Sequence, residues 1–166
     1  MNVLLGFEKQ LSRAIEFLIT VFFFVILCLT VLLVLLRYGF NSSIIWGSEA
    51  MNYLFIYTTA LGAALSVGKG THIRISFLID MTKGRLRKIM DCLVYLFIGG
   101  INAVLGWYSL PWIKTVGSFE SPVMRIPIWL VHMSVPLGCF LAVAYSLLHI
   151  TYIVFGVDTS SEGEGN

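Results

Sequence analysis

This sequence has unusually few charged residues. Its 166 residues include 11 Lys or Arg and 9 Asp or Glu, so 12% are charged, whereas 58% are hydrophobic. A soluble domain usually carries about 25% charged residues, because its surface faces water. The shortage excludes a water-facing surface over most of the chain and indicates lipid as the solvent. The formal net charge of +2 is also too small to indicate a nucleic-acid partner.

Metal ligands and redox cysteines are scarce as well. The three cysteines, Cys28, Cys92 and Cys139, lie in apolar stretches and form neither a C-x-x-C pair nor a metal-binding spacing. We expect them to be free thiols that act as small apolar side chains, and we expect no metal.

The histidines do not predict a haem site. His132 and His149 are seventeen residues apart, which is about 25 Å along one helix, so they cannot bind the same iron. A cytochrome-like electron carrier remains an alternative, and a haem absorption band in the purified protein would identify it. We expect no cofactor.

The long apolar segments contain no Asp, Glu, Lys or Arg between their ends. Membrane pumps and enzymes keep such groups at mid-membrane for pathways and relays. There is also no Gly-x-Ser-x-Gly motif, Ser/Lys arrangement or phosphate-binding glycine loop, so we expect no enzyme. Glu16, at the edge of the first segment, leaves open a homo-oligomeric, proton-coupled small exporter as the alternative function.

What the sequence does contain is four apolar segments of span length. A bilayer core about 30 Å thick needs roughly 20 apolar residues in a helix, and strands are excluded because these segments do not alternate. The sequence predicts an all-α integral membrane protein with one membrane domain, 1–157, and a disordered cytoplasmic tail, 158–166. The expected helices are 14–36, 49–67, 90–113 and 126–155. The last is long enough to tilt, to bend at Pro136 or to extend past one face.

The basic residues predict the orientation. Eight of the eleven Lys and Arg lie on one side of the predicted spans and three on the other. The positive-inside rule then places both termini and the 68–90 loop in the cytoplasm, and the 37–49 and 114–125 loops outside. Residues 1–13 have apolar side chains at helical spacing and predict an amphipathic helix on the inner membrane surface.

Small residues recur at a spacing of four in the last apolar segment, at Gly138, Ala142 and Ser146. Such a face lets helix backbones approach closely in lipid. Two interpretations stay open: packing within this chain, or docking of a second membrane protein.

Three sequence elements resemble one known family. They are Arg-Tyr followed by Ser-x-x-Trp and an acidic helix start within 37–49, a His-Ile-Arg element within 68–75, and Ser-Pro followed by Ile-Pro-Ile-Trp within 121–129. Their order, together with four helices and this length, is similar to the small membrane subunit of tripartite ATP-independent periplasmic (TRAP) transporters, the DctQ type. The resemblance covers about residues 10 to 155.

The resemblance implies a multi-pass protein of the bacterial inner membrane that works with partners. These would be a large polytopic carrier subunit, which moves substrate with sodium ions, and a periplasmic binding protein that delivers an organic acid of the C4-dicarboxylate or sialic acid class. Membrane lipids would surround the complex.

Seven residues are candidates for partner contacts or for structural roles. Trp46 is expected as a headgroup anchor. Arg37 and Glu49 are expected to pair across the short outer loop or to bind the carrier, and His72 and Arg74 to bind the carrier or lipid phosphates. Gly138 and Ala142 complete the set.

Overall fold

Helices make up almost all of the part of the chain that the structure describes. The computed structural model describes residues 2–42, 44–70 and 85–155. The helices are α1 (Asn2–Gly39), α2 (Ile45–Gly68), α4 (Arg85–Val116), α5 (Ile128–His132) and α6 (Ser134–Phe155). Within these residues, four stretches are long and apolar enough to cross a membrane: Glu8–Gly39, Ile45–Gly68, Lys88–Val116 and Ile128–Val154. The prediction of four membrane-spanning helices is confirmed.

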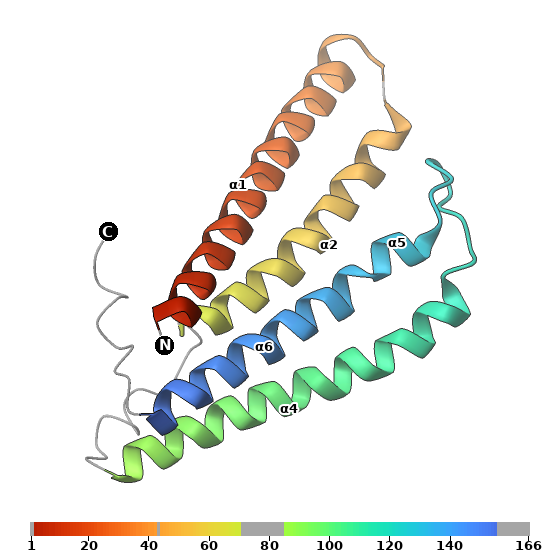
Figure 1. Cartoon of the computed structure of the whole chain (residues 1–166). Helices are drawn as coiled ribbons and strands as arrows, with labels where there is room; N and C mark the ends of the chain where they lie inside the picture. Colours follow the sequence, from red (N-terminus) through yellow and green to blue (C-terminus); the bar gives the residue numbers. More distant parts are fainter. Residues whose placement is uncertain (1, 43, 71–84, 156–166) are drawn as a thin grey trace.

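The long helices lie in a row and do not close into a bundle. Figure 1 shows the order α1, α2, α6, α4, and close backbone contacts between long helices join only these neighbours within the described residues. The short α5 continues the line of α6. The row is a single layer, so its two broad faces are open to whatever surrounds the protein in the membrane.

The two ends of the row differ. The first turns of α2 and the segment 117–127 lie at one end, called here the loop end, and the N-terminus of α1 and the last turns of α6 lie at the other, the terminal end (Figure 1). A small core lies toward the terminal end and joins three helices. It consists of Ile15 from α1, Ala64, Leu65 and Val67 from α2, and Ala142 and Tyr145 from α6.

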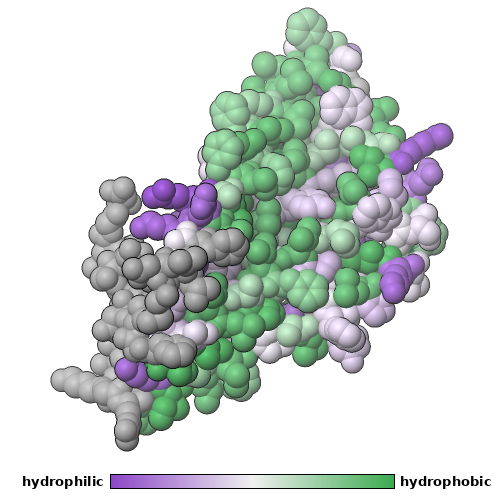
Figure 2. Space-filling model, in the orientation of Figure 1, coloured by the Kyte–Doolittle hydropathy of each residue, from purple (hydrophilic) through white to green (hydrophobic). Residues whose placement is uncertain are grey.

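Most of the apolar surface lies outside this core. No residue of the most apolar 18-residue stretch of α1 is buried. Figure 2 shows hydrophobic atoms along the helices and hydrophilic atoms at the two ends. In water such a surface would be unstable, whereas lipid or another membrane protein can cover it.

The first helix starts earlier than the sequence predicts. It begins at Asn2 instead of near residue 14, and it runs without interruption for 38 residues, about 57 Å. Residues 2–13 are therefore continuous with the first span and do not form a separate helix. Their position on the membrane surface, and the orientation of the termini, remain predictions.

The last apolar segment is interrupted at Met133, between α5 and α6. Pro136 explains the position, because it has no N–H to bond the carbonyl of His132, four residues earlier. The chain continues in nearly the same direction, since Met133 N–H donates to Trp129 O (3.0 Å) and Leu137 N–H donates to Met133 O (3.2 Å). The break lies three residues before the proline that the sequence singles out.

Candidate interaction sites

Glu49 ties the start of α2 to the segment 117–127. It lies on the first turns of α2, and its carboxylate accepts hydrogen bonds from the Tyr53 hydroxyl (2.5 Å), the Met124 N–H (2.9 Å) and the Ser121 hydroxyl. Ser121 is buried. Hydrogen bonds to an ionised acceptor are about twice as strong as neutral ones. We call these four residues the Glu49 clasp.

The segment held by this clasp has a defined backbone. Ser121 N–H donates to Ile126 O (2.9 Å), and Ile128 N–H donates to Phe119 O (2.9 Å). Arg125 adopts φ 51°, which lets the chain turn back after the clasp. The segment 117–127 is thus a fixed turn attached to α2, and it presents the exposed side chains of Phe119 and Val123 at the loop end.

The predicted pairing of Arg37 with Glu49 is not present. The Arg37 side chain is exposed at the end of α1, and the Glu49 carboxylate is bonded by the residues of the clasp and by the backbone of Val123. The carboxylate turns toward the 117–127 segment because hydrogen-bond donors of that segment reach it. Trp46 lies half-exposed on the first turn of α2, at the end of a span where an interfacial tryptophan is expected.

Polar contacts also fasten the terminal end. Three side chains of α1, four residues apart and therefore on one face, reach α6 and the residue that follows α2. They are Glu8, which accepts from the Tyr152 hydroxyl (2.7 Å), Ser12, which bonds the Tyr145 hydroxyl (2.9 Å), and Glu16, which forms an ion pair with Lys69. Because α1 has so little buried apolar surface, these contacts fix its position against α6 and the end of α2.

We expect Tyr152→Phe to loosen this attachment. The hydroxyl belongs to a buried ring and donates to the Glu8 carboxylate, so its removal should lower the free energy of unfolding by about 1 kcal/mol. Titration of the detergent-solubilised protein with SDS, followed by circular dichroism, measures the change. Tyr108→Phe is the matched control, because Tyr108 is exposed on α4. Equal stability of both variants would contradict a structural role for the Glu8 contact.

The buried histidine at the terminal end is part of the packing. The Nε2 atom of His149 bonds the carbonyl oxygen of Gly68 (2.8 Å), and its ring stacks on Tyr95 with centroids 4.7 Å apart. The other histidine of this segment, His132, contacts the ring of Trp112 edge-on. Both rings therefore have packing partners. Among the described residues, no three His, Cys, Asp or Glu side chains are placed to hold a metal ion.

Gly138 and Ala142 lie where α6 packs against α2. A Cβ atom at Gly138 would lie 2.8 Å from the carbonyl oxygen of Ala60, so only glycine allows this approach. Ala142 is buried in the core. Gly138 and Ala142 therefore pack within the chain, and both also line a groove in the same region. Docking of a second membrane protein at this face stays a prediction.

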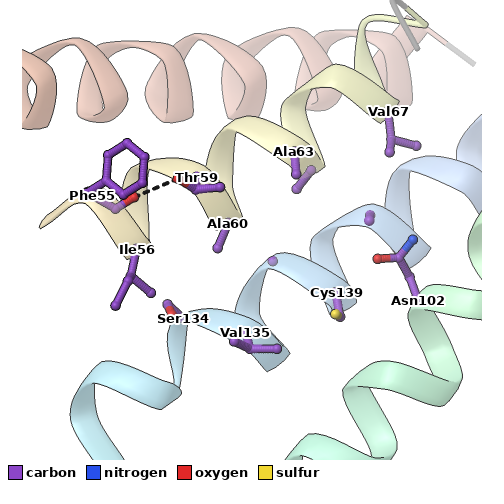
Figure 3. Close-up of a pocket in the computed structure, with 13 residues that line it drawn as sticks. Phe55, Ile56, Thr59, Ala60, Ala63, Val67, Asn102, Ser134, Val135 and Cys139 are labelled. Atoms are coloured by element: carbon purple, nitrogen blue, oxygen red, sulfur yellow. Dashed lines mark hydrogen bonds between the residues drawn. The ribbon is translucent and has the colours of Figure 1, made fainter. Parts of the chain in front are cut away.

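That groove runs between α2, α6 and α4 and has a volume of about 470 Å³. Figure 3 shows α2 and α6 as its two sides, with Asn102 reaching into it from α4. The sequence does not predict this groove, because its lining among the described residues includes one uncharged amide side chain and no Asp, Glu, Lys or Arg that would stand out within an apolar segment.

Two candidate residues, His72 and Arg74, lie outside the described residues. Conversely, the structure brings forward Ser121 and Tyr53, which bond the Glu49 carboxylate. Ser121 belongs to the Ser-Pro element that the sequence singles out. For the contact between Tyr53 and Glu49, the only indication in the sequence is their spacing of one helical turn.

The fold and the contacts define a class of protein: an all-helical, multi-pass membrane protein whose polar clusters lie at the ends of its helices. Residues 26–155 match the family described as tripartite ATP-independent periplasmic transporters, DctQ component. The chain therefore belongs to the DctQ family. It is a multi-pass protein of the inner membrane, in a family of transporter subunits and not of enzymes.

Curated relatives agree with this assignment. The chain is 30% identical over 143 residues to the C4-dicarboxylate TRAP transporter small permease protein DctQ of Rhodobacter capsulatus, covering 73% of this chain and 60% of the relative. It is 31% identical over 121 residues to the protein of the same name from Vibrio cholerae serotype O1, covering 68% and 50%. The sialic acid TRAP transporter permease protein SiaT of Haemophilus influenzae is 30% identical over 90 residues, covering 54% and 15%. The chain thus spans between half and three-fifths of the length of the first two relatives.

Proposed function

We propose that this chain is the accessory subunit of a sodium-coupled, binding-protein-dependent secondary transporter. In this proposal a separate, large polytopic subunit carries the substrate and the ions. The chain supports that carrier in the membrane and helps to dock the periplasmic binding protein. The substrate is an organic acid of the C4-dicarboxylate or sialic acid class, as the names of the relatives indicate for those proteins.

The observation that carries the proposal is the open row of helices. A carrier must enclose its substrate and its ions between helices, and it needs polar or charged groups at mid-membrane to bind them. Here the apolar segments contain no charged residue between their ends, and the backbones of α1 and α4 make no close approach within the described residues. A single layer with two uncovered apolar faces is suited to packing against a larger membrane protein.

The orientation follows from the same proposal. The loop end faces the periplasm, where the exposed Phe119 and Val123 of the clasped turn lie within reach of a soluble partner. The terminal end, with the predicted excess of basic residues, faces the cytoplasm. The Glu49 clasp then has a role, because a docking surface has to be held in one shape to avoid an entropic cost on binding.

Native mass spectrometry of the tagged chain, purified from its own host in mild detergent, tests the proposal. We expect a stoichiometric complex with one much larger polytopic membrane protein. A homodimer that binds cationic drugs and loses them on Glu16→Gln would contradict it and would identify the chain as an exporter. The pairing of Glu16 with Lys69 at the terminal end gives that alternative no added support.

A further inference from the structure

The first turns of α1 carry two exposed basic side chains on one side of the helix. Lys9 and Arg13 are one helical turn apart, and Phe17, one further turn along, is 73% exposed. We call these three residues the Lys9–Phe17 stripe. Each of them directly follows a residue of the α1 face that contacts α6 and Lys69, so the stripe is turned about 100° away from that face. The stripe therefore faces the surroundings of the protein and not the neighbouring helices.

The acidic side chains of the same turns already have partners. Glu8 accepts a hydrogen bond from the Tyr152 hydroxyl, and Glu16 forms an ion pair with Lys69. Arg13, in contrast, has no ion pair and no side-chain hydrogen bond within the described residues. Its guanidinium is always charged, and it has five N–H donors and no acceptor. The stripe is thus a cationic surface, and an anion from outside the chain can bind there without displacing these two carboxylates.

The position of the stripe along α1 matches the depth of lipid headgroups. The uncharged run of α1 extends from Phe17 to Leu36, twenty residues or about 30 Å, which is the thickness of the hydrocarbon core of a bilayer. Phe17 then lies at the edge of that core, with Arg13 about 6 Å and Lys9 about 12 Å beyond it. The headgroup layer is about 5–8 Å thick on each side. Arg13 therefore falls inside this layer, and the long side chain of Lys9 reaches it from the water side.

We propose that the Lys9–Phe17 stripe binds an anionic phospholipid such as phosphatidylglycerol. The Arg13 guanidinium donates two parallel hydrogen bonds to the phosphate oxygens, Lys9 adds a second positive charge, and an acyl chain packs on Phe17. The occupant is a lipid and not a soluble anion, because the stripe has a charged end and an apolar end in the order that a phospholipid has. A lipid held there fixes the depth of α1 in the membrane. The inference goes beyond the proposed function and does not depend on it.

Photoreactive lipids test the proposal on the full-length chain in liposomes, together with any subunit that purifies with it. A phosphatidylglycerol and a phosphatidylcholine that carry the same photoreactive acyl chain are compared, and mass spectrometry of the peptides measures labelling around Phe17. Arg13→Gln and the double variant Lys9→Gln/Arg13→Gln remove charge from the stripe. Arg37→Gln is the matched control, because Arg37 is an exposed arginine at the other end of the same helix and has no basic residue one turn away. Circular dichroism checks that each variant folds.

We expect phosphatidylglycerol to label the region around Phe17 at least about fivefold more than phosphatidylcholine, and less so at high salt. Arg13→Gln should reduce labelling by phosphatidylglycerol about fivefold and the double variant further, whereas Arg37→Gln should leave it within about a factor of two. Equal labelling by the two lipids, unchanged labelling of the folded double variant, or an equal loss in the control would overturn the proposal. So would the absence of labelling by either lipid, because a protein would then cover the stripe.

Discussion

Replacing Glu49 with leucine should release the 117–127 segment from α2. The exchange leaves the Ser121 hydroxyl and the Met124 N–H without their acceptor while Ser121 stays buried. Local opening should become easier, and we expect the Met124 amide to exchange its hydrogen about tenfold faster or more. Hydrogen exchange with mass spectrometry, on peptides that cover 117–127, measures this directly.

Glu49→Gln separates the loss of acceptors from the loss of packing. The glutamine amide keeps one acceptor oxygen and carries an NH2 group, which cannot accept a hydrogen bond, in place of the other oxygen. Ser121 and Met124 donate to different oxygens of Glu49, so one of the two contacts is lost and one can remain. In Glu49→Gln, the Met124 backbone amide should exchange its hydrogen at a rate between those of the native chain and Glu49→Leu. Glu120→Gln is the control for charge, because Glu120 is an exposed acid in the same segment. Unchanged exchange at Met124 in Glu49→Leu would contradict the clasp.

The same substitution should also act on transport if the proposed function holds. The clasped turn presents Phe119 and Val123 in one arrangement, and a released turn has to be ordered again at each encounter with the binding protein. We therefore expect uptake by Glu49→Leu to need a higher concentration of binding protein, with the carrier still bound to the chain. If Glu49→Leu no longer binds the carrier, Glu49 acts in assembly of the complex and not in docking of the binding protein.

Gly138→Ala should weaken the packing between α2 and α6, the two central helices of the row. The new Cβ would lie 2.8 Å from the backbone oxygen of Ala60 and 3.1 Å from its Cβ. A backbone atom cannot move aside as the end of a side chain can, so α2 and α6 have to shift apart. We expect a loss of about 1–3 kcal/mol in the free energy of unfolding, measured by SDS titration.

Gly62→Ala is the matched control for this substitution. It makes the same chemical change within α2, but a Cβ at Gly62 would meet nothing within 4 Å. Without a clash, alanine should be neutral or stabilise the helix by about 0.5–1 kcal/mol, since it restricts the unfolded backbone. A similar loss of stability in both variants would contradict the packing role of Gly138.

The membrane environment explains why the helices could be predicted so completely. Lipid offers no hydrogen-bond partner to a backbone group, so an uncharged segment of about twenty residues has helix as its one stable form. That argument needs only the local composition of the chain, which is sufficient to predict the four membrane-spanning helices. Composition does not predict that the first helix continues to Asn2, because residues 2–13 carry charges, which a helix tolerates where it extends beyond the membrane.

The contacts of the candidate residues were harder to predict. The position of Glu49 at a helix start marks it in the sequence, and the short loop between Arg37 and Glu49 predicts a pair that the structure does not contain. The observed partner, Ser121, is 72 residues away. Gly138 and Gly62 look alike in the sequence, yet one packs tightly and the other meets nothing.

The sequence by itself determined the solvent, the number of spans and the family, because apolar length and motif order are local properties of the chain. Tertiary structure alone decided the order of the helices, the partner of Glu49 and the groove with Asn102. The reason is physical: in lipid, the faces that meet other helices and the faces that meet hydrocarbon are both apolar, so hydrophobic periodicity does not tell them apart. Which face turns inward depends on close packing between distant segments, and only their arrangement in space reveals it.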